Sequence, residues 1–288
     1  MPSLIDIRRR IRSVKNTQQI TKAMKMVSAA KLRRAQDRVL SARPYARMME
    51  AMLADVAAAA PQNPEGGPLH PLLDQREEKR IQLVLVTADR GLAGSFNANL
   101  IKAAQRFLEE HARQPVEMIL VGRKGRDFFR KRNVTVTAEW TGIANKPTYA
   151  DAQAVAGRLI QRFAAAEVDA VYLIYNEFKS VVAQKLTVSR ILPMAVPERS
   201  GETREYLMEQ PPEQLLGALL PRYVEVAVYQ ALIESTAAEQ AARMTAMDAA
   251  STNAGEVIEK LTLYMNRVRQ ASITKEIIEV VSGAAALE

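Results

Sequence analysis

The residues best placed for chemistry lie in the segment Thr87-Ala-Asp-Arg-Gly-Leu-Ala-Gly-Ser95. It follows a predicted strand and precedes a predicted helix, a position at which backbone N–H groups often bind phosphates. The segment lacks the GxGxxG and GxxxxGKS/T spacings, and with them the phosphate-binding lysine. A second strand-to-helix segment, Val121-Gly-Arg-Lys-Gly125, is equally unspecific. We interpret both as turns that pack a helix against a strand, with phosphate binding as the weaker alternative.

Other catalytic chemistries have few residues to use. Cysteine is absent, which excludes disulfides, thiolate catalysis and zinc–thiolate sites. The two histidines, His70 and His111, stand in polar sequence surroundings, and we interpret them as surface residues. We therefore predict no catalytic residue, no metal site and no cofactor.

The net charge of +8 is unevenly distributed along the 288 residues. Residues 1–50 hold 13 Lys/Arg and 3 Asp/Glu, whereas residues 213–288 hold 6 and 10. A basic and an acidic arm attract each other, which leaves surplus positive charge facing outward. Such a face could bind nucleic acid or anionic lipid, but no aromatic residue precedes Tyr45 to stack on a base. We predict no nucleic-acid partner.

Two long helices are expected at the ends of the chain. From Leu219 to Val268, positions spaced alternately four and three residues apart are apolar or small, except Gln230, Gln240 and Ser251. A spacing that averages 3.5 residues is typical of a coiled coil, and some 70 residues form a rod roughly 100 Å long. Residues 3–58 form the second helix, with Ser3 as N-cap and Asp6 three residues later. Its apolar positions drift around Gln18, where Ile20, Met24 and Val27 continue the pattern.

Between the helices, strands and helices alternate. The expected strands are 81–87, 116–121, 134–138 and 168–175, separated by helices 97–111, 124–132 and 149–166. Residues 181–191 read as an exposed antiparallel strand, and 61–80 and 193–212 as proline-rich linkers. This alternation predicts a mostly parallel sheet covered on both faces. The predicted fold is a long antiparallel coiled coil (residues 1–60 and 212–288) with an inserted Rossmann-like α/β domain (residues 78–195).

No segment reaches the 18–20 apolar residues of a membrane span, so we expect a soluble protein made and kept in the cytoplasm. If the helices begin and end as predicted, the numbers of facing residues add to roughly 270, which brings Met24 near Met244. The last 15–20 residues then have no partner helix, although they are rich in Ile and Val. We expect them to project beyond the pair.

Four blocks resemble one family, the gamma subunits of F-type, proton-translocating ATP synthases of the bacterial type. They are Ile11–Lys31 (IRSVKNTQQITKAMKMVSAAK), Thr87–Asn97 (TADRGLAGSFN), Glu239–Ser251 (EQAARMTAMDAAS) and Arg269–Ala284 (RQASITKEIIEVVSGA). They lie at both ends and in the middle, so the resemblance covers essentially the whole chain. The family often has Cys where Ala93 stands, and the cysteine-bearing insertion of the chloroplast version is missing.

The resemblance implies a non-catalytic rotor in the central stalk, which couples proton flow through a membrane ring to ATP synthesis or hydrolysis. The implied partners are the alpha and beta subunits, epsilon and the c-subunit ring, with no nucleotide bound by this chain itself. The implied location is peripheral, on the cytoplasmic side of the cell membrane. The matching positions are Lys22, Met24 and Lys25 facing an acidic beta-subunit lever, Arg243 in the matching C-terminal segment, Arg269 and Gln270 at a beta-subunit catch loop, and Ile277 and Val281 in an apolar sleeve.

Two alternatives remain open. A static coiled-coil adaptor would bind the same partners without rotating. A nucleotide-using α/β enzyme would bind nucleotide alone.

Overall fold

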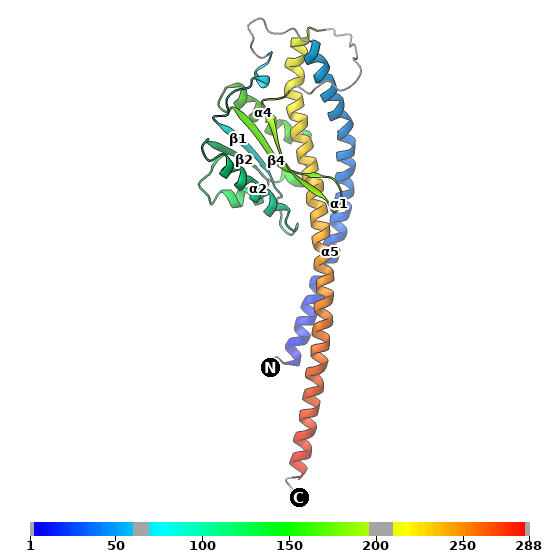
Figure 1. The fold of residues 1–288 in the computed structure, drawn as a ribbon. Helices are drawn as coiled ribbons and strands as arrows, with labels where there is room; N and C mark the ends of the chain where they lie inside the picture. The colour runs from blue at the N-terminus through cyan, green and yellow to red at the C-terminus, as the bar shows by residue number, and fades with distance from the viewer. Residues whose placement is uncertain (1–2, 60–68, 196–209, 286–288) are drawn as a thin grey trace. The chain divides into compact units, whose positions relative to one another are not determined.

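The computed structural model describes residues 3–59, 69–195 and 210–285, with side chains as far as Ser282. The chain divides into two compact units, and each is described by itself. The helical unit comprises Met1–Ser28 and Arg243–Glu288, and the sheet unit comprises Ala29–Ala242. Two helices, α1 (Leu4–Ala59) and α5 (Pro212–Ala285), contribute to both units (Figure 1).

In the helical unit, α1 and α5 run antiparallel. The Ser3 hydroxyl oxygen accepts the backbone N–H of Asp6 at 3.2 Å, which confirms the predicted N-cap. Further along, the Gln18 side-chain amide donates to the carbonyl of Ser251 at 3.2 Å. Lys25 pairs with Asp248 at 2.6 Å. Both contacts lie within about one turn of the predicted register, which is therefore confirmed.

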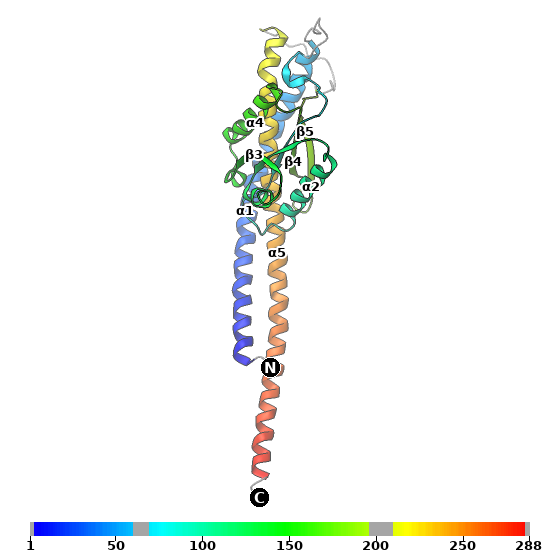
Figure 2. The same cartoon turned by 90° about the vertical axis from the view of Figure 1, so that its left-hand side faces the viewer.

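Among the described residues of this unit, the end of α5 has no partner helix. Buried and half-buried positions follow the predicted seam through Ser251, Ala254 and Leu261 as far as Val268. Beyond Val268 the helix continues to Ala285, a further length of roughly 25 Å at 1.5 Å per residue. Figures 1 and 2 show this segment extending past the beginning of α1. The predicted projecting tail is confirmed.

The predicted apolar face of α1 is wrong around Gln18. Ile20 and Val27 are 60% and 56% exposed, whereas Thr21 and Ser28 are 8% and 2% exposed. The buried face keeps the four-and-three spacing from Ile7 onward without drift, and polar residues occupy it where the pattern seemed to shift. These polar side chains are tolerated because they bond to the backbone, as Thr21 does to the carbonyl of Gln18 at 3.0 Å.

The sheet unit contains one five-stranded sheet. Its strands are β1 (Ile81–Val86), β2 (Val116–Val121), β3 (Thr135–Trp140), β4 (Ala170–Phe178) and β5 (Gln184–Leu192). The order is β3-β2-β1-β4-β5, and all neighbours are parallel except the antiparallel edge pair of β4 and β5. The mostly parallel sheet with an antiparallel edge strand is as predicted.

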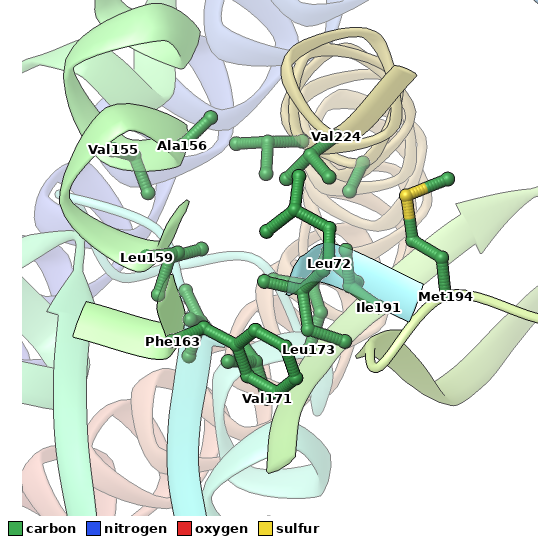
Figure 3. Packing of buried hydrophobic residues seen from close by; sticks show 14 of the residues in the cluster. Leu72, Val155, Ala156, Leu159, Phe163, Val171, Leu173, Ile191, Met194 and Val224 are labelled. Atoms are coloured by element: carbon green, nitrogen blue, oxygen red, sulfur yellow. The ribbon is translucent and has the colours of Figure 1, made fainter. Parts of the chain in front are cut away.

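Helices cover both faces of the sheet. The connecting helices are α2 (Phe96–Glu110), α3 (Arg123–Phe129) and α4 (Tyr149–Ala164). In Figure 2, α2 and α4 lie on opposite sides of the strands. Alternating residues of β4 show the division: Tyr172 packs on Phe107 of α2, whereas Val171 and Leu173 enter the core beneath α4. Figure 3 shows that core between Leu159 and Phe163 of α4 and Val224 of α5.

Two local predictions need correction. The segment 61–80 is not wholly a linker, because its described part contains a 3-10 helix, η1 (Pro71–Leu73), whose Leu72 is fully buried in the core. His70 caps this turn by accepting the N–H of Leu72, and Pro71 suits its first position. The short helix α3 ends at Phe129 rather than Arg132. A second 3-10 turn, η2 (Ile143–Asn145), precedes α4.

Among the described residues, one helix, α5, is long and apolar enough by composition to cross a membrane. This helix contains no long continuous apolar run, because polar residues interrupt its apolar residues, and the sequence therefore did not predict it as a membrane span. Within the sheet unit its apolar residues Leu216, Leu220, Val224 and Val228 lie in the protein core. Burial against the sheet therefore accounts for the apolar composition of that part.

Candidate partner-binding surfaces

The loop after β1 is held by internal contacts. The Thr87 hydroxyl donates to the carbonyl of Val121 at 3.0 Å and accepts the N–H of Gly125 at 2.9 Å. The N–H of Ala88 donates to the Asn97 side chain at 3.0 Å. Gly122 adopts a φ of 93°, and a Cβ there would overlap the carbonyl oxygen of Thr87. These contacts support the interpretation of both turns as structural.

Asp89 completes the same arrangement from the middle of the loop. One carboxylate oxygen accepts the N–H of Arg123 at 3.1 Å and that of Gly142 at 3.0 Å. The carboxylate thus binds the first residue of α3 and the turn after β3. It neutralises the positive end of a helix, where a bound phosphate would otherwise be favoured.

The two histidines are half-buried, so the prediction of surface histidines is wrong. Burial lowers the pKa of His70, whose Nδ1 accepts the N–H of Leu72 at 3.2 Å. The His111 ring stacks on Phe107 with centroids 4.1 Å apart, and its Nδ1 lies 2.9 Å from the Phe107 carbonyl. Across the described ranges 3–59, 69–195 and 210–285, no group of three or more His, Cys, Asp or Glu residues could hold a metal ion.

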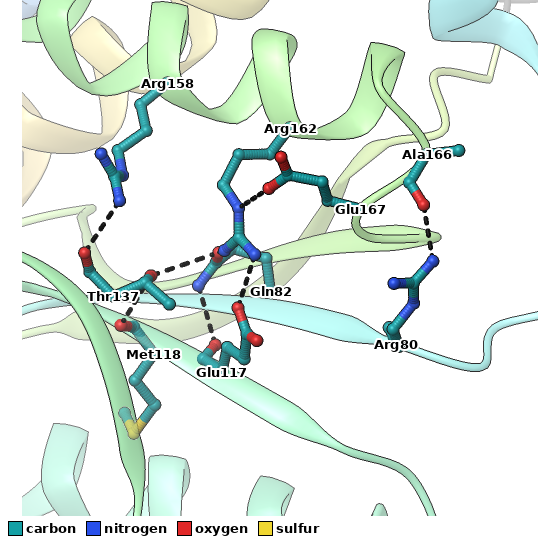
Figure 4. A network of polar contacts seen from close by, with 9 residues as sticks. All are labelled: Arg80, Gln82, Glu117, Met118, Thr137, Arg158, Arg162, Ala166 and Glu167. Carbon is teal, nitrogen blue, oxygen red and sulfur yellow. Dashed lines mark hydrogen bonds and ion pairs between the residues drawn. The ribbon is translucent and has the colours of Figure 1, made fainter.

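A polar network in the sheet unit centres on Arg162 of α4 (Figure 4). Its guanidinium pairs with Glu117 at 2.7 Å and Glu167 at 2.8 Å, and also donates to the buried Gln82 side chain. Burial by itself lowers the pKa of Arg162, but the hydrogen bonds to Glu167 and Glu117 outweigh it and raise the pKa. A guanidinium held in this way stays protonated near neutral pH, so it is not suited to acid–base catalysis. The role of the network is structural, because its hydrogen bonds tie α4 to the sheet.

The predicted site residues of the helical unit differ in how available they are. On α1, Lys22 is exposed and Met24 is half-buried, whereas Lys25 is paired with Asp248 of α5. On α5, Arg243 is buried, and Arg269 and Gln270 are exposed. The sequence did not reveal the Lys25–Asp248 pair, which makes one of the predicted cations less available to a partner.

The tail of α5 presents apolar side chains on more than one face. Ile273, Ile277, Ile278, Val280 and Val281 are between 48% and 72% exposed. Ile277 and Val281, the two predicted sleeve residues, stand one turn apart. Exposed apolar surface of this extent usually marks an interaction site.

Known proteins resemble the chain over its full length. A family model described as ATP synthase matches residues 3–287. The ATP synthase gamma chain of Solibacter usitatus is 64% identical over 288 residues, 100% of both chains. The chain belongs to the ATP synthase gamma chain family. Among other relatives, the gamma chain of Pelotomaculum thermopropionicum is 50% identical, again with 100% of both chains covered.

Solved structures of the same kind share the fold. A chain of the Tetrahymena thermophila mitochondrial ATP synthase central stalk and c-ring is 26% identical, with a TM-score of 0.61 over 81% of this chain and 99% of that one. A chain from the rotational state 3 structure of the Euglena gracilis mitochondrial ATP synthase (OSCP, F1 and c-ring) is 20% identical, with a TM-score of 0.68. It covers 99% of this chain and 94% of that chain. The predicted fold class, long terminal helices with a mixed α/β sheet, is confirmed.

Part of the exposed apolar surface on α1 of this gamma chain family member was not predicted from the sequence. Ile20, Met26 and Val27 of α1 are between 56% and 70% exposed, beside the basic Lys22. The apolar pattern predicts Ile20 and Val27 on the buried face, and Met26 lies between them. Extending the strict four-and-three spacing from Ile7 would have placed them outside the seam.

Proposed function

We propose that the chain is the central-stalk rotor subunit of a proton-translocating ATP synthase. It couples proton flow through a membrane ring of c subunits to ATP synthesis or hydrolysis in a ring of alpha and beta subunits. The observation that carries this proposal is the exposed apolar tail of α5, from Ile273 to Val281, on a helix that has lost its partner. A soluble helix seldom exposes such a surface unless another protein covers it.

The chemistry of the tail suits a bearing. Apolar contact is non-directional and roughly proportional to the area buried, so it holds an axle without favouring one angle strongly. Burying a side chain such as Ile277 fully stabilises the complex by about 1.5–3 kcal/mol. An apolar sleeve formed by the alpha and beta subunits would therefore hold the tail and still let it turn.

The surface through which the chain would push the beta subunits lies on the exposed face of α1 and near the end of the helix pair. Lys22 stands next to the exposed apolar Ile20 and Val27, a combination that suits an acidic lever with apolar neighbours. Met24 is a polarisable side chain that can repack as a contact slides. Arg269 and Gln270 are exposed donors suited to the carboxylates or carbonyls of a catch loop on beta.

The remaining partners follow from the same proposal. Epsilon and the c-ring bind the α/β domain and the adjoining helices, and the complex places the chain peripherally on the cytoplasmic side of the cell membrane. The chain itself performs no catalysis. The Thr87 loop supports this, because the Thr87 hydroxyl is bonded to Val121 and Gly125 and the Ala88 N–H donates to the Asn97 side chain.

Co-purification of the tagged chain with alpha, beta and epsilon subunits tests this assembly. Ile277→Asp should lower the yield of alpha and beta several-fold, because the complex must bury a carboxylate in an apolar sleeve. The matched control is Val182→Asp, which replaces an 88% exposed apolar residue of the sheet unit and should leave the yield of alpha and beta unchanged. Equal yields for both variants would contradict the tail as a bearing.

A further inference from the structure

A cavity of about 280 Å³ lies in the sheet unit between α1, α5 and the residues at the end of η2. Four of its ten lining residues are cations: Lys31, Arg34, Arg38 and Lys146. None of the ten is Asp or Glu. Three of the cations follow one another along α1 at spacings of three and four residues, so they line one side of the hollow.

These cations have no acidic partner in the part of the chain that the structure describes. The Lys31 ammonium donates to a neutral group, the side-chain oxygen of Asn145, at 3.4 Å. Like charges gathered around one hollow repel one another. An anion placed among them would remove this repulsion and gain charge-assisted hydrogen bonds.

A buried donor at the cavity points to the same kind of ligand. Gln240 lines the cavity and is 1% exposed, and its side-chain nitrogen is buried without a hydrogen-bond partner among the described residues. Nearby Thr236 is already used, since its hydroxyl lies 2.8 Å from the carbonyl of Leu232 and 2.9 Å from that of Ala144. Buried polar groups are nearly always paired, so the Gln240 amide lacks an acceptor.

We propose that this cavity binds a small tetrahedral oxyanion, inorganic phosphate. Its oxygens supply the acceptors that Gln240 lacks, and its negative charge matches the guanidinium groups of Arg34 and Arg38. The volume lies below the 300–1,000 Å³ typical of sites for larger ligands, so it favours phosphate over a whole nucleotide. The proposal does not rest on the rotor function, because it is argued from the residues that line the cavity, all of which belong to the sheet unit.

Equilibrium dialysis of the purified full chain against labelled inorganic phosphate, at constant ionic strength in chloride, tests the site. Saturable binding of one phosphate per chain is expected. The double variant Arg34→Gln/Lys146→Gln should weaken it about tenfold or more, because two charge-assisted contacts are lost. The double variant Lys102→Gln/Arg106→Gln removes the same charge from exposed positions of α2 outside the cavity and should leave phosphate binding unchanged.

Gln240→Leu separates binding from folding. It removes an unpaired buried amide, so the unfolding midpoint should stay the same or rise while phosphate binding weakens. Three outcomes would overturn the proposal: no saturable phosphate binding, equal binding by the cavity and control variants, or tighter binding of ATP than of phosphate by the unaltered chain.

Discussion

Glu234 of α5 joins α1 to the end of β4. One carboxylate oxygen pairs with the Arg43 guanidinium at 3.0 Å, and the other accepts the backbone N–H of Phe178 at 2.8 Å. The Glu234 side chain is 2% exposed, and Arg43 also donates to the Phe178 carbonyl at 3.3 Å. All three residues belong to the sheet unit, so the contact fixes the helix pair to the sheet within that unit.

Replacing this carboxylate should destabilise the chain. Glu234→Leu leaves the Phe178 N–H without an acceptor and Arg43 without its counter-ion. Breaking a buried pair costs about 3–5 kcal/mol, and we expect about 2–3 kcal/mol here because the partly exposed Arg43 side chain can turn to water. Urea unfolding measures the change. Glu259→Leu, at an exposed position of the same helix, should shift the midpoint little, and equal shifts would contradict the role of Glu234.

Two glycines should respond to the same substitution with opposite signs. Gly122→Ala places a Cβ against the Thr87 carbonyl at a φ of 93°, so it should destabilise the chain by about 1–3 kcal/mol. Gly157→Ala lies on the exposed side of α4, where a Cβ meets nothing within 4 Å, and should stabilise the chain by up to about 1 kcal/mol. Thermal unfolding monitored by circular dichroism compares them. A Gly122→Ala variant as stable as the unaltered chain would show that the turn relaxes.

Stability should fall at high pH through Tyr175 of β4. Burial, and then the charges of Glu177 and Glu234, raise the pKa of Tyr175 to about 12. The folded state therefore favours the neutral phenol, so this contribution is complete below about pH 10 and is lost as pH rises toward 12. Tyr175→Phe should remove up to about 2 kcal/mol of the loss between pH 9 and pH 12. The midpoints of urea unfolding at pH 9 and at pH 12 measure this loss. If the midpoint fell by the same amount in the variant and in the unaltered chain, the prediction would be contradicted.

Met24→Lys should impair coupling more than assembly. Met24 lies between Lys22 and Lys25 in the sequence, and a further ammonium there would pair with an acidic lever on the beta subunit. An extra attraction in one rotary state holds the shaft in that state. The variant should co-purify with alpha and beta while ATP-driven proton pumping falls several-fold. Met24→Leu, which keeps the volume of the side chain and adds no charge, is the control and should leave pumping unchanged. Unchanged pumping by Met24→Lys would count against the contact.

The sheet was predictable from the sequence because its strands are short apolar runs bounded by turns. The polar seam of α1 was not, because Thr21 and Ser28 are buried by their place in the helix pair and not by their own chemistry. Burial of Leu72 was missed for a similar reason: it lies among prolines, and its contacts come from residues far away in the sequence.

The candidate sites also differ in whether the sequence alone could predict them. The tail residues Ile277 and Val281 could be found because an apolar pattern outlasts its partner helix. The Lys25–Asp248 pair and the unpaired Gln240 amide could not, since each depends on which side chains two distant segments bring together. The sequence predicts which residues of the two helices face each other only to within one turn. A single ion pair depends on the exact residues that face each other, so it could not be predicted.

The most direct test of the rotor proposal is observation of a single assembled complex. The chain contains no cysteine, so Val182→Cys provides one exposed attachment point for a bead. With the alpha and beta ring fixed to a surface, addition of ATP should turn the bead in one direction over many revolutions. A complex that hydrolyses ATP while the bead stays in place would contradict the rotor proposal and favour a static adaptor.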